Sequence, residues 1–166
     1  MKASKARKVF TAIVAAMALL LWQLLQPVFL VQGGGRTLLA LPVSRPQAFT
    51  IRFIHSVQKT PVEEDLVADA GARDGAGEFR LLRTRYQSFG VGLPFMESEG
   101  DFREEGDYFV FDHMDRHFPA LSLRTGVGTQ LTLFAAGRAL RLYTMFPPGE
   151  RIDLSIAPAY EALSGH

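Results

Sequence analysis

An uncharged, strongly apolar stretch over residues 9–31 restricts this 166-residue chain more than any other feature of its sequence. As one helix it would be about 34 Å long at about 1.5 Å per residue, enough to cross a hydrocarbon core of about 30 Å. Four cations and no acid come before it, namely Lys2, Lys5, Arg7 and Lys8. We therefore predict one membrane-spanning helix with a basic N-terminal tail.

An uncleaved anchor is favoured over a cleaved signal peptide, because the apolar region of a signal peptide is usually only about 7 to 15 residues long. A signal peptide cleaved near Gly33, within "VQG", is one alternative, and a buried helix of a soluble protein is another. Basic residues beside a span tend to stay in the cytoplasm. We therefore expect a tail and anchor over residues 1–32, a glycine-rich linker and first strand over 33–47, and an external domain over 48–166.

The charge of the expected external domain differs from that of the whole chain. The sequence has 18 basic and 17 acidic residues, and without the four N-terminal cations 14 basic residues stand against 17 acidic ones, a net charge of about −3. This composition gives no strong positive field, so we expect no nucleic-acid partner. The absence of cysteine excludes disulfides, thiolate metal sites and a cysteine nucleophile.

The rest of the sequence alternates between apolar and polar residues with a period of two, which indicates half-buried strands. Glycine, proline and aspartate separate the apolar runs, and "AAGRA" is a hairpin signal. Nine strands are predicted, over residues 37–41, 49–55, 63–69, 78–86, 107–112, 120–125, 130–137, 139–146 and 151–156. We predict a mainly β fold, an antiparallel β-sandwich or partly open barrel with one N-terminal transmembrane helix.

The stretch "FIHSVQKTPVEE" is the first candidate site. It places His55 and Ser56 at the end of a strand, and the turn at Thr60 leads to two acids, Glu63 and Glu64. Such a set could bind a ligand or cation, or pair a base with a carboxylate. The alternative is a strand end in which side chains bond to turn backbone. Glu63 and Glu64 are adjacent in a strand, so we expect them on opposite faces and at most one in a pocket.

The stretch "YQSFGVGLPFMESEG" is the second candidate. Its Ser88, Phe89, Gly90, Gly92 and Pro94 suggest an unusual backbone followed by a fixed bend. It has no lysine and no helix start, so it is neither a P-loop nor a dinucleotide-binding fingerprint, and it lacks the first glycine of a nucleophile elbow. The alternative is a purely structural loop. Our hypothesis is that this loop and the His55 turn form one cleft.

The stretch "DHMDRH" holds His113 and His117 four residues apart, with Asp112 and Asp115 beside them. On a helix this spacing could hold a metal ion. The segment lies between two predicted strands, and a loop with solvated charges is favoured. We predict no catalytic residue, no metal ligand and no cofactor.

Three stretches together, "IRFIHSVQKTPVEEDL", "TRYQSFGVGLP" and "GERIDLSI", resemble an uncharacterised bacterial family, the domain of unknown function numbered eighteen-fifty. The similarity covers most of residues 48–156. The positions that match the two motifs are His55, Ser56, Thr60, Pro61, Glu63, Glu64, Ser88, Phe89, Gly90, Gly92, Leu93 and Pro94. The family often has an acid where Gln58 stands here, which weakens any cation site in this chain.

The resemblance implies a single-pass protein of the bacterial inner membrane with its C-terminal domain in the periplasm. It also implies a non-enzymatic accessory role beside a TAXI-type TRAP transporter, with the permease, the solute-binding protein or the transported acid as partner. Two other functions stay open. One is a metal-dependent or serine hydrolase that uses the His55 and Glu64 region, and the other is a structural envelope protein without a ligand.

Overall fold

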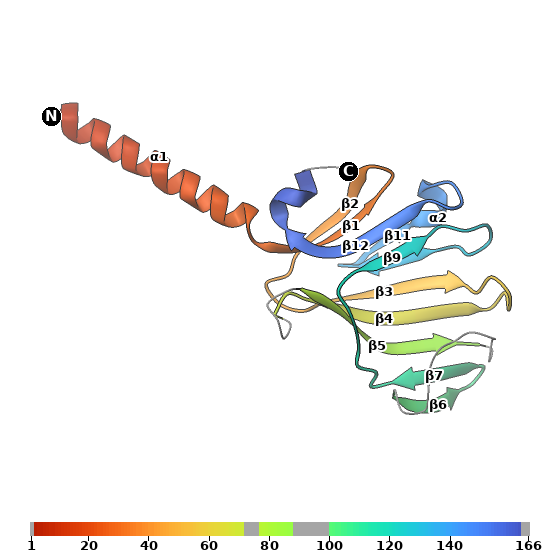
Figure 1. Ribbon diagram of the computed structural model, residues 1–166. Helices are drawn as coiled ribbons and strands as arrows, with labels where there is room; N and C mark the ends of the chain where they lie inside the picture. The colour runs from red at the N-terminus through yellow and green to blue at the C-terminus, as the bar shows by residue number, and fades with distance from the viewer. Residues whose placement is uncertain (1, 72–76, 88–99, 164–166) are drawn as a thin grey trace.

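The computed structural model describes residues 2–71, 77–87 and 100–163 (Figure 1). One long helix projects from a body made of strands. The elements in chain order are α1 (Lys2–Leu24), β1 (Pro27–Gly33), β2 (Arg36–Pro42), β3 (Gln47–Ile54), β4 (Pro61–Asp69), β5 (Glu78–Tyr86), β6 (Asp101–Glu105), β7 (Tyr108–Asp112), β8 (Arg116–Phe118), β9 (Leu121–Arg124), β10 (Thr132–Ala135), β11 (Arg138–Arg141), α2 (Leu142–Met145), β12 (Arg151–Pro158) and the 3-10 helix η2 (Ala159–Leu163).

The strands form two antiparallel sheets. The small sheet has the order β2-β1-β12-β9, and the large sheet has the order β11-β10-β3-β4-β5-β7-β6, with β8 paired to β5. The sheets lie face to face and do not close into a barrel (Figure 1). The prediction of a mainly antiparallel β fold with one N-terminal apolar helix is confirmed.

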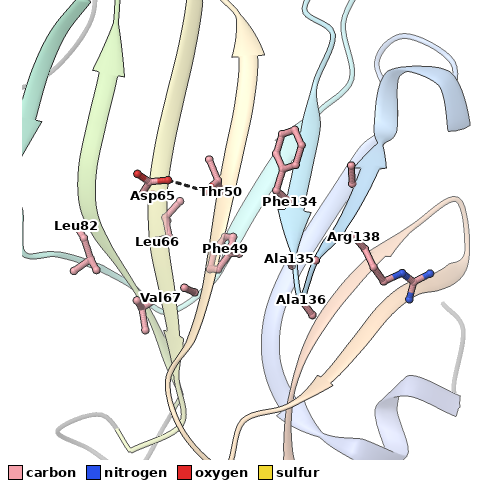
Figure 2. A pocket seen from close by; sticks show the side chains of 13 residues that line it. Phe49, Thr50, Asp65, Leu66, Val67, Leu82, Phe134, Ala135, Ala136 and Arg138 are labelled. Carbon is pink, nitrogen blue, oxygen red and sulfur yellow. Dashed lines mark hydrogen bonds between the residues drawn. The ribbon is translucent and has the colours of Figure 1, made fainter. Parts of the chain in front are cut away.

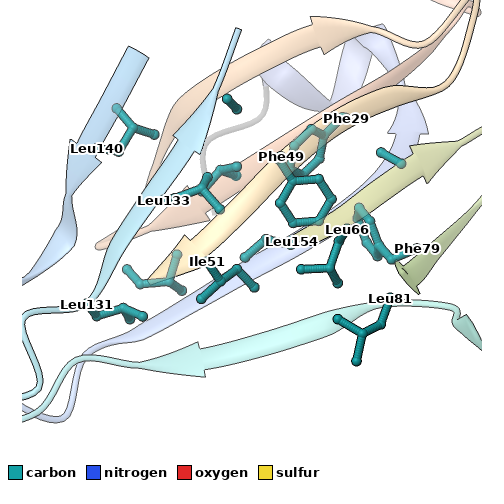
Figure 3. Close-up of a cluster of buried hydrophobic side chains, with 14 of the residues drawn as sticks. Phe29, Phe49, Ile51, Leu66, Phe79, Leu81, Leu131, Leu133, Leu140 and Leu154 are labelled. Carbon is teal, nitrogen blue, oxygen red and sulfur yellow. The ribbon is translucent and has the colours of Figure 1, made fainter. Parts of the chain in front are cut away.

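The core lies between the two sheets, and aromatic rings from both sheets meet at its centre (Figure 3). Phe29 of β1 lies 4.8 Å from Phe49 of β3 and 5.4 Å from Phe79 of β5, measured between ring centroids. Edge and tilted contacts of this kind stabilise a core beyond the area that the rings bury. Leu133 of β10 and Leu154 of β12, both fully buried, extend the same layer.

The predicted helix over residues 9–31 is wrong at its C-terminal end. Helix α1 ends at Leu24, and the last apolar residues form β1, between β2 and β12. Proline at position 27 has no N–H and disfavours a helical conformation at the residue before it. Phe29, Leu30 and Val31 are fully buried. A central strand that is buried on both faces is as apolar as a membrane helix, so composition did not separate the two.

The glycines after β1 form a hairpin turn, so the predicted linker over Gly33–35 is wrong. Gly33 pairs with Arg36, and the two residues between them, Gly34 and Gly35, have φ of 58° and 69°. Two successive positive φ values are typical of the tight turn that suits the twist of antiparallel strands. The predicted hairpin at "AAGRA" has the same form, with Ala136 and Gly137 both at positive φ between β10 and β11.

Other strand predictions were correct to within a few residues, with two kinds of exception. The predicted strand over 139–146 ends at Arg141, where the single helical turn of α2 begins. Strands β6 and β8 were not predicted. Every residue of β6 is exposed and three of its five are acids, so it lacks the apolar alternation by which a strand is recognised.

Residues 5–23 of helix α1 are all exposed, and the helix meets the body at its C-terminal end, where it contacts η2. The stretch Lys5–Leu24 is long and apolar enough to cross a membrane, and none of its apolar window is buried against the sheets. The helix extends away from the body in Figure 1. It could serve as a membrane anchor or as a signal sequence.

Candidate functional site

His55 begins the turn that joins β3 to β4. Backbone N–H groups of that turn form hydrogen bonds with its imidazole ring. The N–H groups of Val57 and Gln58 donate to His55 Nδ1 at 3.3 and 3.2 Å. The His55 N–H donates to the Thr60 carbonyl, and the Lys59 N–H donates to the His55 carbonyl, both at 2.9 Å. A neutral ring that accepts at Nδ1 carries its proton on Nε2. The imidazole therefore stabilises the turn, and its Nδ1 is not free to act as a base or ligand.

The other predicted residues of this turn do not converge on the histidine. Ser56 is exposed and Thr60 is half-buried. Within the described parts of the chain, no hydrogen bond or ion pair joins His55 to Ser56, Glu63 or Glu64. These contacts give the predicted set a structural role in the turn, and they assemble neither a base–carboxylate pair nor a nucleophile.

Glu63 and Glu64 point to opposite faces of β4, as the strand period predicts. The Glu63 carboxylate lies 3.4 Å from Arg52 on β3 and 3.7 Å from Arg85 on β5, which places it between two cations on the outer face. The guanidinium of Arg85 also lies over the ring of Tyr108, 3.8 Å from its centroid. Glu63 thus forms ion pairs with arginines on both neighbouring strands.

Glu64 lies on the inner face, in register with Ile51 and Thr84. Burial raises the pKa of its carboxyl, and the positive charge of Arg116 partly lowers it. Thr84 is fully buried, and its Oγ1 has no hydrogen-bond partner within the part of the chain that the structure describes. Glu64 therefore faces the interior of the sandwich, on the same side of β4 as the buried Val62.

A groove of about 610 Å³ crosses the outer face of the large sheet (Figure 2). Its floor is mostly apolar, and Phe134 of β10 points into it with 38% of its surface exposed. Val67 of β4 and Leu82 of β5 line its other side. One carboxylate, Asp65, lies in the groove and accepts a hydrogen bond from Thr50 Oγ1 at 2.7 Å. Because the Asp65 carboxylate already has a hydrogen-bond partner, the apolar surface is the main feature of this groove.

A second hollow of about 440 Å³ continues the first one, since Phe134 and Ala139 line both. Its character is polar and basic. The polar side chains that line it are Arg52, Gln130, Thr132, Arg141 and Tyr143. Arg52 pairs with Glu63, whereas Arg141 is exposed and has no acidic partner among the described residues. We call the two hollows together the outer groove, with an apolar half and a basic half.

The His55 turn supports the basic half of the outer groove. Phe53 and Ile54, which lead into the turn, line this half together with Gln130. The Ile54 N–H donates to the Thr129 carbonyl at 2.6 Å, which ties the turn to the loop before β10. The motif that the sequence singled out therefore positions a groove wall and does not itself carry the exposed chemistry.

The outer groove was not predicted from the sequence, although one signal for it was available. On β10, Leu133 and Ala135 are buried in the core, so Phe134 stands on the face where a polar residue is expected. A contiguous exposed apolar patch marks a binding surface, whereas a single exposed apolar residue is ordinary, so Phe134 alone was a weak signal. Arg141 gave no such signal, because an arginine on an edge strand is ordinary.

The predicted residues of the second motif, Ser88, Phe89, Gly90, Gly92 and Pro94, lie outside the described residues. The single cleft that would join them to the His55 turn stays a prediction.

The histidines of "DHMDRH" make separate pairings. His117 lies 2.8 Å from Glu78 and 3.1 Å from Asp115, and His113 lies 2.9 Å from Asp101. Over residues 2–71, 77–87 and 100–163 no group of three or more acidic or histidine side chains is arranged to hold a metal ion. The pair of His117 with Glu78 joins β8 to β5, and the pair of His113 with Asp101 joins the loop after β7 to β6.

Comparison with known proteins gives one match. The family described as Domain of unknown function (DUF1850) matches residues 49–142, more than half of the chain. No curated protein and no solved structure matches. The matched residues run from β3 through β11, and they include every residue that lines the outer groove except Ala48 and Tyr143.

Proposed function

The chain belongs to the DUF1850 family, and we propose that it is a membrane-anchored, non-catalytic binding protein of the bacterial cell envelope. In this proposal α1 spans the inner membrane, the sandwich lies in the periplasm, and the protein assists a TAXI-type TRAP solute transporter. The outer groove carries the proposal. It is a large surface hollow, it lies almost entirely within the family match, and its two halves differ in chemistry.

The chemistry of the outer groove selects an organic anion with an apolar body. The apolar half offers the exposed ring of Phe134. The basic half offers Arg141, which has no acidic partner in the described chain, at the end of β11. An arginine can bind a carboxylate with two parallel hydrogen bonds. A ligand of this class could be the transported acid itself, which makes the protein a binding accessory of the permease.

Two observations favour binding over hydrolysis. His55 Nδ1 accepts two backbone N–H groups, and Glu64 points to the opposite face from Glu63. A base, a nucleophile and an acid would have to meet within about 3 Å of one another for the hydrolase mechanism. The described residues offer no such meeting point around His55.

Solute uptake by cells tests this proposal. Arg141→Gln and Phe134→Ser are expected to reduce uptake through the partner transporter at equal protein levels. The first variant removes the proposed contact with the carboxylate of the ligand, and the second removes the proposed contact with its apolar body. Arg45→Gln is the control, since Arg45 is an exposed arginine in the loop between β2 and β3 and lines neither half of the outer groove. Phenylacetate binding to the full-length protein in nanodiscs provides a second measurement. Native uptake and native phenylacetate binding in both groove variants would contradict the proposal.

A further inference from the structure

Helix α1 continues into the small sheet with almost no connecting chain. Only Leu25 and Gln26 separate α1 from β1. Their backbone N–H groups donate to carbonyls of the last helical turn, Leu25 to Leu21 at 3.1 Å and Gln26 to Gln23 at 3.2 Å. The Gln26 side chain also donates to the Trp22 carbonyl at 3.1 Å. Because the connection is short and hydrogen-bonded, the direction of α1 restricts the orientation of the sandwich.

The 3-10 helix η2 is fixed beside this junction. The Ala159 N–H donates to the Gln26 carbonyl at 2.9 Å, and Thr37 Oγ1 on β2 donates to the Ala162 carbonyl at 3.1 Å. Helix η2 also contacts α1, β1 and β12. It therefore lies where α1 leaves the sheet, at the same end of the body (Figure 1).

Exposed apolar side chains gather at this end of the molecule. Trp22 in the last turn of α1 and Leu25 just after the helix are 59% and 64% exposed, and Tyr160 and Leu163 on η2 are 46% and 78% exposed. Tryptophan and tyrosine are enriched where a membrane meets water, because their rings are amphipathic. Leucine beside them adds apolar area that the headgroup region can bury.

We propose that η2 lies in the headgroup region of the membrane that α1 spans, with lipid as the partner of Tyr160 and Leu163. This rests on the proposed function only for the insertion of α1. Lipid is the partner that the chain itself indicates, because an α1 that spans the membrane places the membrane surface at the level of Trp22. The sandwich is then held upright, and the His55 turn, at the opposite end of the strands, points away from the lipid.

Fluorescence quenching in liposomes tests the docking of η2, and the composition of the chain suits this measurement. The chain has no cysteine and one tryptophan, so one introduced thiol and Trp22 each report from a single place. The full-length protein carries a bimane label at Leu163→Cys or, as control, at Val127→Cys, in lipids with a nitroxide near the headgroup. Val127 is matched in exposure, at 83%, and lies in the loop next to the His55 turn.

We expect quenching of Trp22 and of the label at position 163, and no quenching of the label at position 127. Tyr160→Asp in the Leu163→Cys protein should reduce the quenching at 163 while Trp22 stays quenched. Quenched Trp22 with an unquenched label at 163 would overturn the docking of η2 and leave the anchor intact. Unquenched Trp22 would show that α1 is not inserted, which contradicts the anchor itself.

Discussion

The two sheets of the sandwich differ in their contacts with the rest of the chain and in how much of each sheet the family match covers. Three strands of the small sheet, β1, β2 and β12, lie outside the family match, and the small sheet is the one joined to α1. The large sheet lies almost wholly within the match and carries the outer groove on its exposed face. One sheet thus connects the body to the helix, and the other displays the outer groove, which we propose as the binding surface. Changes in the small sheet should affect stability, and changes on the outer face of the large sheet should affect binding.

Removal of β1 is the strongest test of this division. A chain of residues 34–166 loses Phe29, Leu30 and Val31, each fully buried. Burial of one such side chain stabilises a fold by about 1.5 to 3 kcal/mol. Together they approach the stability of an ordinary domain, about 5 to 15 kcal/mol. We expect this chain to show no cooperative thermal transition by circular dichroism, whereas a chain of residues 27–166 should show one. Equal melting of both chains would contradict a central role for β1.

A pair of aromatic truncations compares the two sheets directly. Phe29→Ala should lower the free energy of unfolding by about 3 to 5 kcal/mol, because it leaves a cavity between Phe49 and Phe79. Phe134→Ala should lower it by about 1 kcal/mol or less, since that ring is partly exposed. Urea unfolding of both variants measures the difference. A larger loss from Phe134→Ala than from Phe29→Ala would reverse the assignment of roles.

The His55 turn should show a smaller effect that is confined to one end of the large sheet. His55→Ala removes the acceptor for the Val57 and Gln58 N–H groups, and we expect a loss of about 1 kcal/mol in stability. His55→Asn is the matched variant, because an asparagine oxygen can accept from the N–H two residues later. Hydrogen exchange should accelerate at Val57 and Gln58 in the alanine variant and much less in the asparagine variant. Unchanged exchange in both would mean that the imidazole does not hold the turn.

The smallest expected effect distinguishes the two faces of β4 by pH. Burial raises the pKa of Glu64 above its ordinary value of 4.5, so the folded state holds a proton that the unfolded state releases. The free energy of unfolding therefore falls as the pH rises from 4.5 through the raised pKa. Glu64→Gln removes this loss, and its melting temperature should exceed that of the native protein at pH 7 but not below pH 4.5.

Glu63→Gln is the control on the outer face. It breaks the pairing with Arg52 and Arg85, so it should not raise the melting temperature at any pH. A gain in both variants would show that the effect does not depend on which face the carboxyl occupies.

The sequence predicted strands best where a single face is buried. In β3, Phe49 and Ile51 alternate with Thr50 and Arg52, and the predicted strand matches the observed one closely. The same reasoning failed at β1, whose burial pattern is nearly continuous and therefore lacks alternation. Proline at position 27 was the available signal for the end of α1, because it interrupts the apolar run.

The site was harder to predict than the fold. The sequence identified the His55 turn and the opposite directions of Glu63 and Glu64, since both follow from local geometry. The outer groove depends on strands distant in the sequence, because β10 pairs with β3 only through the tertiary fold. No local sequence pattern places Phe134 beside Thr50, so neither β3 nor β10 alone could predict the groove.

The position of β1 also has a consequence for biosynthesis. Its register with β12 runs from Pro27 opposite Pro158 to Gly33 opposite Ile152, so one whole side of β1 is completed by the last of the described strands to be synthesised. The hairpin with β2 can form as soon as both emerge from the ribosome. The remaining backbone edge stays open through nearly all of translation, and an open edge invites pairing with another chain. The small sheet is thus complete only after β12 has been synthesised and has paired with β1.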